Sequence, residues 1–472
     1  MWWRAVASVL VGALLGAGFV VDRHAGTPVT VRQYAAPADL ADPAAAGLLA
    51  PAPDYSALSA RLAEVVAAHP VPGAGRVGLA VVDGAGRPVL LDRAGVPLLP
   101  ASTQKLVTAA AALSALGPDF RYRTVVKATA PIGPDGTLVG DLVLTGSGDP
   151  ALSTPLFAAK VAGQRPRTPL EALADQVAAA GVRRVTGRVL GDPTALADEP
   201  TAPGWLDRYI SSLQVGRMSG LMIDAGRQLL PEGETLRARP SLDPAADAAA
   251  ALTTLLTERG VVVAGSAHST RRPPPALVQL GAVDSPRLAK LLRYMVQYSD
   301  NALAEGVFRT LGRIDGGDGS WAASAKNTVR SLDGLGLDWS GVVIADGSGL
   351  SQANRMPAAF LAALDVAMRR SRAQPVWDTL MAVAGETGTL RARLVGTVAE
   401  HRLHGKTGTL RRVRCLEGSV AGPRGARIHV AVIGNDLDPA GVRAVRALQD
   451  ALVTTVVQEL DQERSARGEP SH

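Results

Sequence analysis

The stretch from Ala101 to Ala110 constrains this chain most, because it places a serine and a lysine one helical turn apart. It follows Pro100 and runs without a helix breaker to Gly117, so a helix of about fifteen residues is predicted here. Ser102 lies at the start of this helix, and Lys105 follows at i+3 on the same face. A serine hydroxyl needs an adjacent base to become a nucleophile, and a lysine whose pKa is lowered by burial can be that base. Taken alone, the pair is weak evidence, because an S-x-x-K is more often an N-capping serine followed by a solvated lysine.

Lysine usage gives this pair more weight. The chain has six Lys against 43 Arg, and an arginine cannot lose its proton to act as a base. One of the six is Lys105, and another is Lys406 in the run Lys406-Thr407-Gly408-Thr409. Between them stands Ser299-Asp300-Asn301, which uses one of only four Asn residues. Each short motif is a weak signal, but all three in this order rarely arise by chance.

S-x-x-K, S-D-N and K-T-G in this order resemble the signature of penicillin-binding proteins and serine β-lactamases. Ser299 lies 197 residues after Ser102, which leaves room for an inserted domain that simple β-lactamases lack. The chain is therefore most similar to the class C low-molecular-mass penicillin-binding proteins, the D-alanyl-D-alanine carboxypeptidase/endopeptidase family. Further local matches extend the resemblance over roughly residues 56 to 460: Gly146-Ser147-Gly148-Asp149-Pro150, Asp346-Gly347-Ser348-Gly349-Leu350-Ser351 with Asn354-Arg355, and Gly388-Thr389-Leu390.

The resemblance implies a role for each motif in acyl transfer. Ser102 would be the nucleophile, and neutral Lys105 would be its base. Ser299 would carry the proton to the departing D-alanine nitrogen, and Asn301 would hold both Lys105 and the substrate amide. Lys406 would keep Lys105 neutral by like-charge repulsion and would attract the terminal carboxylate of the substrate.

Substrate binding is expected mainly around the K-T-G motif. The hydroxyls of Thr407 and Thr409 would bind the terminal carboxylate, and the backbone N–H groups of Ser102 and Thr409 would form the oxyanion hole. Gly408 fits this position because a β-carbon there would crowd a substrate lying along the strand.

Some residues near these motifs have less certain roles. Ser348 and Arg355 match family loops and are expected to line the cleft, although turn stabilisation explains such residues equally well. The strand after K-T-G departs from the family in carrying Arg411, Arg412 and Arg414, which leaves the local substrate preference open.

Composition and pattern predict a folded chain of the α+β class. With 47% hydrophobic and 19% charged residues, the 472 residues can bury a large core. An antiparallel sheet flanked by helices is expected, as in a penicillin-binding/serine β-lactamase-like domain, with an inserted domain between the S-x-x-K and S-D-N motifs. The expected divisions are a signal peptide or membrane anchor at 1–25, an Ala/Pro-rich spacer at 26–54, a split catalytic domain at 55–127 and 276–461, the insertion at 128–275, and a polar tail at 462–472.

Periodicity predicts the main elements within these divisions. In the catalytic parts, the expected helices are 56–69, the Ser102 helix, a helix from 285, 302–311 and 439–460, and the expected strands are 77–82, 88–91, 403–410, 412–420 and 427–434. In the insertion, the expected elements are helices at 169–180 and 244–259 and a strand at 184–190.

The N-terminus carries an export element. The seventeen residues from Ala5 to Val21 have no charge, and Asp22-Arg23 follows them. This run is slightly long for the core of a signal peptide and slightly short for a membrane span, and we favour an uncleaved anchor. In either case the rest of the chain would lie outside the cytoplasm, where peptidoglycan is found.

Charge and motif content restrict the partners. The net charge of +6 comes from scattered arginines without a basic run, which disfavours nucleic-acid binding. The histidines show no metal-ligand spacing and no G-x-G-x-x-G pattern occurs, so neither a metal nor a cofactor is expected. The expected partners are peptidoglycan stem peptides, with β-lactam antibiotics as covalent inhibitors.

Two other functions remain open at this point. A β-lactamase or esterase of the same fold is disfavoured by the long insertion and by the lack of an E-x-x-L-N pattern between Asn301 and Lys406, where only Glu305, Glu386 and Glu400 occur. A non-catalytic scaffold that binds the cell wall is disfavoured because all three motifs are intact.

Overall fold

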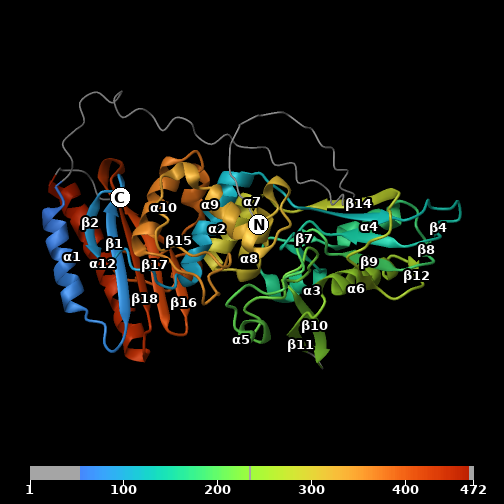
Figure 1. Cartoon of the computed structure of the whole chain (residues 1–472), viewed down its shortest axis with the longest axis horizontal. Coiled ribbons are helices and arrows are strands. Elements are labelled where there is room, and N and C mark those ends of the chain that lie inside the picture. The colour runs from blue at the N-terminus through green and yellow to red at the C-terminus, as the bar shows by residue number, and fades with distance from the viewer. Residues whose placement is uncertain (1–53, 233–234, 467–472) are drawn as a thin grey trace, which may run out of the picture.

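The structure is a computed structural model, and it describes residues 54–232 and 235–466. The expected export segment, nearly all of the spacer and the end of the polar tail lie outside these residues. Within the two described ranges, no helix is both long enough and apolar enough to span a membrane. The described residues form an elongated molecule with one sheet at each end and a group of helices between them (Figure 1).

The C-terminal strands and the first two strands form one antiparallel sheet of six. Its strand order is β15-β16-β17-β18-β1-β2. The two N-terminal strands therefore join the four C-terminal strands through the pairing of β1 with β18. The bounds are β1 Arg76–Asp83, β2 Pro88–Asp92, β15 Ala382–Val383, β16 Leu403–Leu410, β17 Val413–Ala421 and β18 Arg427–Asn435. Five of these strands confirm the expected positions to within about two residues, and β15 is an additional short strand.

Helices cover both faces of this sheet. Leu79 and Val81 of β1 pack under α1 (Ser56–Ala68) and α12 (Pro439–Ala466), while Ala80 and Val82 point to the central helices. This alternation follows the two-residue repeat of a strand. Because both faces are covered, β1 and β18 are apolar and buried along almost their whole length. Figure 1 shows α1 and α12 on the outer side of the sheet and α10 on its inner side.

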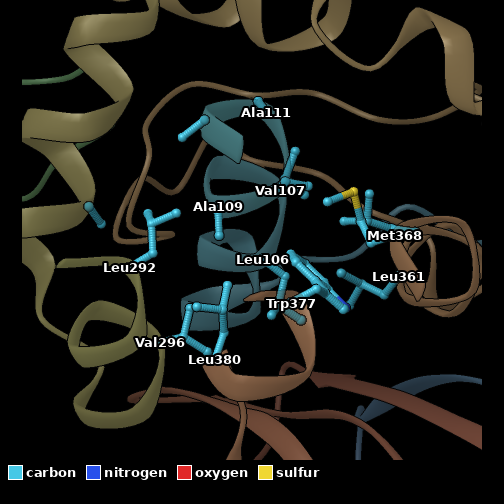
Figure 2. Packing of buried hydrophobic residues seen from close by; sticks show 14 of the residues in the cluster. Leu106, Val107, Ala109, Ala111, Leu292, Val296, Leu361, Met368, Trp377 and Leu380 are labelled. Carbon is cyan, nitrogen blue, oxygen red and sulfur yellow. The ribbon is translucent and has the colours of Figure 1, made fainter. Parts of the chain in front are cut away.

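Helix α2 (Gln104–Leu116) lies at the centre of the inner core. It is buried nearly all round, as expected of a helix that is apolar on every face. The run Ala109–Ala112 has side chains small enough to let neighbouring helices approach closely. Figure 2 shows Leu292, Val296, Leu361, Met368, Trp377 and Leu380 packed around it. Those residues belong to α7 (Leu288–Tyr298), α10 (Ala358–Arg370) and α11 (Gln374–Leu380).

The inserted segment has a sheet and a core of its own. Its five strands are ordered β13-β9-β5-β3-β14, and α4 (Glu171–Ala179) and α6 (Pro244–Thr257) supply apolar residues to the same core. The strands are β3 Arg123–Ala128, β5 Leu142–Thr145, β9 Val189–Asp192, β13 His268–Ser269 and β14 Val278–Asp284. Since β3 and β14 belong to this sheet, it extends at both ends beyond the 128–275 boundaries expected from the sequence.

Short elements complete the fold. The insertion also contains one three-stranded sheet, with strand order β12-β8-β4, and two two-stranded sheets, the antiparallel pair β10-β11 and the parallel pair β6-β7. The strands are β4 Thr137–Leu138, β6 Leu152–Ser153, β7 Thr168–Pro169, β8 Arg184–Val185, β10 Arg227–Glu232, β11 Thr235–Pro240 and β12 Val262–Val263. The remaining helices are α3 Pro155–Phe157, α5 Asp207–Ser211, α8 Asn301–Leu311 and α9 Trp321–Arg330.

Candidate active site

Ser102 lies in a tight turn that precedes the predicted helix rather than in its first α-helical turn. Ala101–Thr103 form a 3₁₀ turn, and α2 begins at Gln104. Ala101 has a φ of 46°, in the left-handed region that costs a non-glycine residue about 1–2 kcal/mol. Gly349 lies against the Ala101 carbonyl so closely that a β-carbon there would come within 1.8 Å of its oxygen. The backbone that carries Ser102 is therefore held in place by its neighbours.

Lys105 is fully buried beside Ser102, and its ammonium has three acceptors. The Ser102 hydroxyl oxygen lies 3.1 Å from Nζ, Oδ1 of Asn301 lies 2.7 Å away, and the backbone carbonyl oxygen of Ser348 lies 2.8 Å away. Burial lowers the pKa of Lys105 to about 8, against the opposing effect of the nearby carboxyl groups of Glu305, Asp346 and Asp300. A lysine in this setting loses its proton far more easily than a solvated one.

The S-D-N motif occupies the junction between two helices. Ser299 ends α7 in a left-handed conformation, with a φ of 60°. Asp300 caps α8, because its carboxylate accepts the backbone N–H of Leu303. Asn301 is the first residue of α8. This break between α7 and α8 turns Asn301 toward Lys105.

Asp300 is tied to the inserted segment by a buried ion pair. Nε of Arg165 donates to its Oδ2 at 2.7 Å, and the Arg165 side chain is only 5% exposed. Burial acts to raise the pKa of Asp300, but the Arg165 guanidinium more than offsets this and holds that pKa below its usual range. The ion pair therefore links the insertion directly to the middle of the motif.

Asn301 also contacts the insertion. Its side-chain N–H group donates to the backbone carbonyl of Gln214 at 2.9 Å. This N–H group is the donor that we expected to bind the substrate amide. A cavity of about 240 Å³ lies beside this contact, between the S-D-N motif and the insertion. The residues lining it include Phe157, Arg165, Gln214, Val215, Arg227, Tyr294, Ser299, Asp300 and Asn301.

The K-T-G strand β16 runs along the other side of Ser102. Lys406 is fully buried and donates to the carbonyl of Thr407 at 2.8 Å. Burial, with a smaller effect of the charge on Lys105, holds the pKa of Lys406 well below its usual value. The expected repulsion between the two lysines therefore acts on Lys406, whereas burial is the main cause of the lowered pKa of Lys105.

The other residues of this strand divide into exposed and packed positions. The Thr407 hydroxyl donates to the Thr389 hydroxyl at 2.8 Å, and Thr409 is exposed. A β-carbon on Gly408 would lie 2.8 Å from both the Pro100 carbonyl oxygen and Cβ of Cys415. Gly408 is therefore required for close packing of β16 against the Ser102 turn, which is a different reason from the substrate crowding that we expected.

The loop that follows Ala345 contributes backbone to the site. Ser348 is fully buried and offers its carbonyl to Lys105, so its contribution is not the cleft-lining hydroxyl that we expected. Arg355 donates to the carbonyls of Gln352 and Asn354 in its own loop, which fits the turn-stabilising alternative.

The arginines after K-T-G have similar local partners. Arg412 donates to the carbonyl of Asp436, and Arg414 donates to the carbonyls of Leu410 and Val413. Both guanidinium groups therefore bind backbone at the end of the sheet.

One group among the described residues has ligand atoms close enough together for a metal ion: Asp365, Glu417 and His429. It is buried between α10 and the sheet. The Asp365 carboxylate already accepts from Nδ1 of His429, the indole N–H of Trp377 and the guanidinium of Arg369. The positive charge of that guanidinium opposes a cation, so this group is better described as a buried polar network.

Three site residues escaped the sequence analysis: Arg165, Gln214 and Glu305. Arg165 and Gln214 lie in the insertion, far along the chain from the motifs that they contact, and no local pattern marks them. Glu305 did carry a signal, because it is a charged residue in the apolar run that follows Asn301. The E-x-x-L-N pattern does not include it, since that pattern describes a different role for a glutamate.

Comparison with known proteins agrees with this site. The model of the D-Ala-D-Ala carboxypeptidase 3 (S13) family matches residues 58–235 and 228–456. The chain belongs to this family. It is 31% identical to a D-alanyl-D-alanine carboxypeptidase of Actinomadura sp. over 81% of both chains, and 32% identical to carboxypeptidase DacB of Mycolicibacterium smegmatis over 95% of both.

The fold of the chain also resembles that of a solved penicillin-binding protein. Penicillin-binding protein 4 of Haemophilus influenzae superposes with a TM-score of 0.71 at 20% identity, over 84% of this chain and 99% of that one. The α+β fold and the family expected from the three motifs are thus confirmed, and the protein is a serine-type carboxypeptidase of the S13 family.

Proposed function

We propose that this S13 carboxypeptidase cleaves D-Ala-D-Ala peptides through an acyl-enzyme on Ser102. The observation that carries the proposal is the set of three partners around Nζ of Lys105. Two of them, the Asn301 amide oxygen and the Ser348 carbonyl, can only accept hydrogen bonds. The Ser102 hydroxyl can donate as well as accept. A neutral Lys105 that donates to the first two is therefore left with its lone pair facing the Ser102 proton.

The remaining steps need a proton relay and charge stabilisation. Ser299 carries the proton from Lys105 to the departing D-alanine nitrogen. The backbone N–H groups of Ser102 and Thr409 bind the oxyanion. The terminal carboxylate of the substrate opposes the effect of burial on Lys406 and favours its protonated form, so that Lys406 supplies positive charge when substrate is bound. The hydroxyls of Thr407 and Thr409 bind the same carboxylate.

Asn301 has to exchange one partner in this scheme. Its amide N–H binds the acyl-side amide of the substrate, and the Gln214 carbonyl that now holds that donor gives way. The exposed position of Gln214 supports this exchange, because the side chain anchors nothing in the core.

The substrate is the stem peptide of peptidoglycan, and β-lactams acylate the same serine. The relatives named as D-alanyl-D-alanine carboxypeptidases support the first statement. A Haemophilus influenzae penicillin-binding protein 4 of this fold, described in complex with a β-lactam, is consistent with the second. The site acts outside the cytoplasm, and the apolar N-terminal segment holds the chain at the membrane.

We divide the chain accordingly into a split catalytic domain and an insertion. The catalytic parts are 55–127 and 276–461 with the insertion at 128–275, and the sheet of the insertion takes in β3 and β14. The separate apolar core of the insertion supports this division.

Fluorescent-penicillin labelling tests the proposal. Ser102→Ala should abolish covalent labelling, and Lys105→Arg should reduce it by at least about a hundredfold, because arginine keeps the charge but cannot accept the proton. Lys127→Arg, at a lysine outside the three motifs, is the matched control and should label normally. Normal labelling of either site variant would refute the assignment. A membrane-impermeant label applied to intact cells tests the location.

A further inference from the structure

Glu305 is a buried carboxylate directly behind the candidate base. It lies on α8 one turn after Asn301 and has no exposed surface. Its two oxygens accept the backbone N–H groups of Gly347 and Ser348, each at 2.9 Å. A β-carbon on Gly347 would lie 2.4 Å from Cβ of Phe308, so this loop packs directly on α8. The loop and the carboxylate therefore form one tightly packed unit.

This unit determines where one of the Lys105 partners lies. Ser348 donates its N–H to Glu305 and offers its carbonyl to Nζ of Lys105 at 2.8 Å. The neighbouring Gly347 carbonyl accepts from the hydroxyl of Thr108, one turn after Lys105. Glu305 thus reaches Lys105 through a single residue whose N–H and carbonyl groups are both engaged.

Charge gives a second, direct connection. Among the carboxyl groups that act on Lys105, Glu305 acts most strongly, ahead of Asp346 and Asp300, and Lys406 is the neighbouring lysine. Burial and the adjacent Asp346 raise the pKa of Glu305 to about 8, and its two N–H donors and Lys105 oppose this rise. Both oxygens of Glu305 accept backbone N–H groups, as those of an ionised carboxylate do, and the ammonium formed on Lys105 during acylation favours that ionised form further. A buried charge of this kind acts strongly on a buried neighbour, because little water screens it.

The carboxylates beside Glu305 are already committed to other partners. Asp346 accepts from the N–H groups of Gly349 and Ser351, the amide of Asn354 and the indole N–H of Trp205. Asp300 pairs with Arg165. On the same helix as Glu305, the Arg309 guanidinium donates to the carbonyls of Gly319, Glu199 and Ala197. Asp300 is therefore paired with a cation and Asp346 with four neutral donors, whereas Glu305 binds the N–H of Ser348, the residue whose carbonyl contacts Lys105.

We infer that Glu305 is the positioning residue of this active site: it fixes the Ser348 carbonyl and stabilises the ammonium that Lys105 becomes during acylation. This inference rests on Lys105 acting as the base. The Ser102 proton passes to Nζ as the bond from Oγ to the substrate carbonyl carbon forms. It then leaves with the D-alanine nitrogen as the C–N bond breaks. Glu305 exchanges no proton in these steps, and its part is comparable to that of the aspartate behind a catalytic histidine.

Two variants separate the two parts of this role. Glu305→Gln removes the charge at nearly constant size. Glu305→Asp keeps the charge but is one methylene shorter, so it cannot hold both N–H groups. For each we would measure the penicillin acylation rate from about pH 5 to 9, where a lysine base titrates. The midpoint of Lys105 itself is read from the NMR signals of ¹³Cε-labelled lysine, which are few because the chain has six Lys, and Lys105→Arg assigns its signal.

Acylation needs neutral Lys105, so its rate rises as the pH passes the Lys105 pKa. In Glu305→Gln the ammonium loses its stabilising charge, and both the rate profile and the NMR midpoint should move to lower pH by about one unit or more. The plateau rate should fall by about tenfold or more, because the weaker base accepts the proton less readily. Glu305→Asp should keep a midpoint within about half a unit of the wild type and lose rate only.

An unmoved midpoint in Glu305→Gln, with the wild type labelled normally, would overturn the inference and leave the proposed function intact. A wild type that penicillin does not label would instead overturn the proposed function. Thermal melting shows whether each variant folds. If Glu305→Gln does not fold, Glu305→Asp decides alone, since a midpoint shifted as far as one unit despite the retained charge would contradict the inference.

Discussion

The position of Ser102 is fixed by neighbouring residues that take no part in the reaction. Ala101 is held at a positive φ, and Gly349 and Gly408 lie against the carbonyls of Ala101 and Pro100. Any β-carbon at either glycine would meet backbone atoms, which cannot move aside as a flexible side chain can. The distance between the nucleophile and the K-T-G strand is therefore set by backbone contact. Such placement matters because a shift of about 1 Å can cost about a hundredfold in rate.

Gly408→Ala tests this argument at a single residue. The new methyl group would force β16 away from the Ser102 turn, so we expect a loss of about 1–3 kcal/mol in the free energy of unfolding. We also expect penicillin acylation to slow by at least about tenfold. Gly95→Ala is the matched control, because a β-carbon at Gly95 meets open space. A Gly408→Ala variant with wild-type stability and acylation would show that close packing at Gly408 does not set the distance between β16 and the Ser102 turn.

Helix α10 is joined to the sheet by the buried network around Asp365. Asp365 accepts from His429 at 2.7 Å and from Trp377 at 2.6 Å, and Arg369 pairs with it from the next turn of α10. Burial acts to raise the pKa of Asp365, but the His429 hydrogen bond and Arg369 more than offset this and hold it far below the usual range. Burial and the charge of Asp365 raise the pKa of Glu417 well above its usual value, so this neighbouring carboxyl is neutral.

Substitutions at these two carboxyl groups should therefore differ in effect. Asp365→Asn leaves Arg369 without its buried partner and should cost about 3 kcal/mol of stability at neutral pH. Glu417→Gln replaces a neutral carboxyl with a neutral amide of similar size and should cost less than about 1 kcal/mol. Urea unfolding measures both. Because the folded pKa of Asp365 is depressed, its stabilisation is present above about pH 4 and is lost as the pH falls further, so the Asp365→Asn deficit should shrink there. Equal costs for the two variants would contradict these assigned charges.

The elements of the catalytic half were predictable because their signals are local. The β16 bounds match the expected 403–410, and α8 follows the expected helix after Asn301. The short strands of the insertion were harder, since the single strand expected at 184–190 is two strands, β8 and β9, in different sheets. The 3₁₀ turn at Ser102 was also missed, because close packing against Gly349 and Gly408 imposes it. Such packing depends on segments that the local sequence does not contain.

At the scale of the whole molecule, the insertion is attached at one point and touches the site at another. The chain enters the sheet of the insertion after Tyr122 and leaves that sheet at Ser285, and these two residues exchange hydrogen bonds. The insertion then reaches back to the S-D-N motif through Arg165 and Gln214. The three motifs could be recognised from the sequence because each is a short local pattern. The contacts of Arg165 with Asp300 and of Gln214 with Asn301 could not, because they join residues 135 and 87 positions apart.

The last step of the reaction is hydrolysis of the acyl-enzyme, and it depends on whether water can reach the ester and be activated there. When a peptide is the substrate, D-alanine leaves after acylation, and water can then reach the ester on Ser102. The leaving nitrogen of a β-lactam stays tethered and occupies that space. β-Lactamases of the S-D-N type use an additional glutamate to activate water for this step. In this chain Glu305 is buried with both oxygens bound to backbone N–H groups, so it cannot orient a water molecule at the ester.

We therefore expect rapid turnover of D-Ala-D-Ala peptides but a penicillin acyl-enzyme that lasts from minutes to hours. Each 1.36 kcal/mol of barrier changes a rate by about tenfold, so the absence of an activated water can readily supply several orders of magnitude. Mass spectrometry after mixing with benzylpenicillin would follow the adduct mass on the intact chain, with Ser102→Ala as the unlabelled control. Free enzyme that reappeared within seconds, while hydrolysed penicillin accumulated, would mean that another group activates water and that the protein works as a β-lactamase. A persistent adduct together with released D-alanine from peptide would establish that Lys105 alone suffices for a substrate whose leaving group departs.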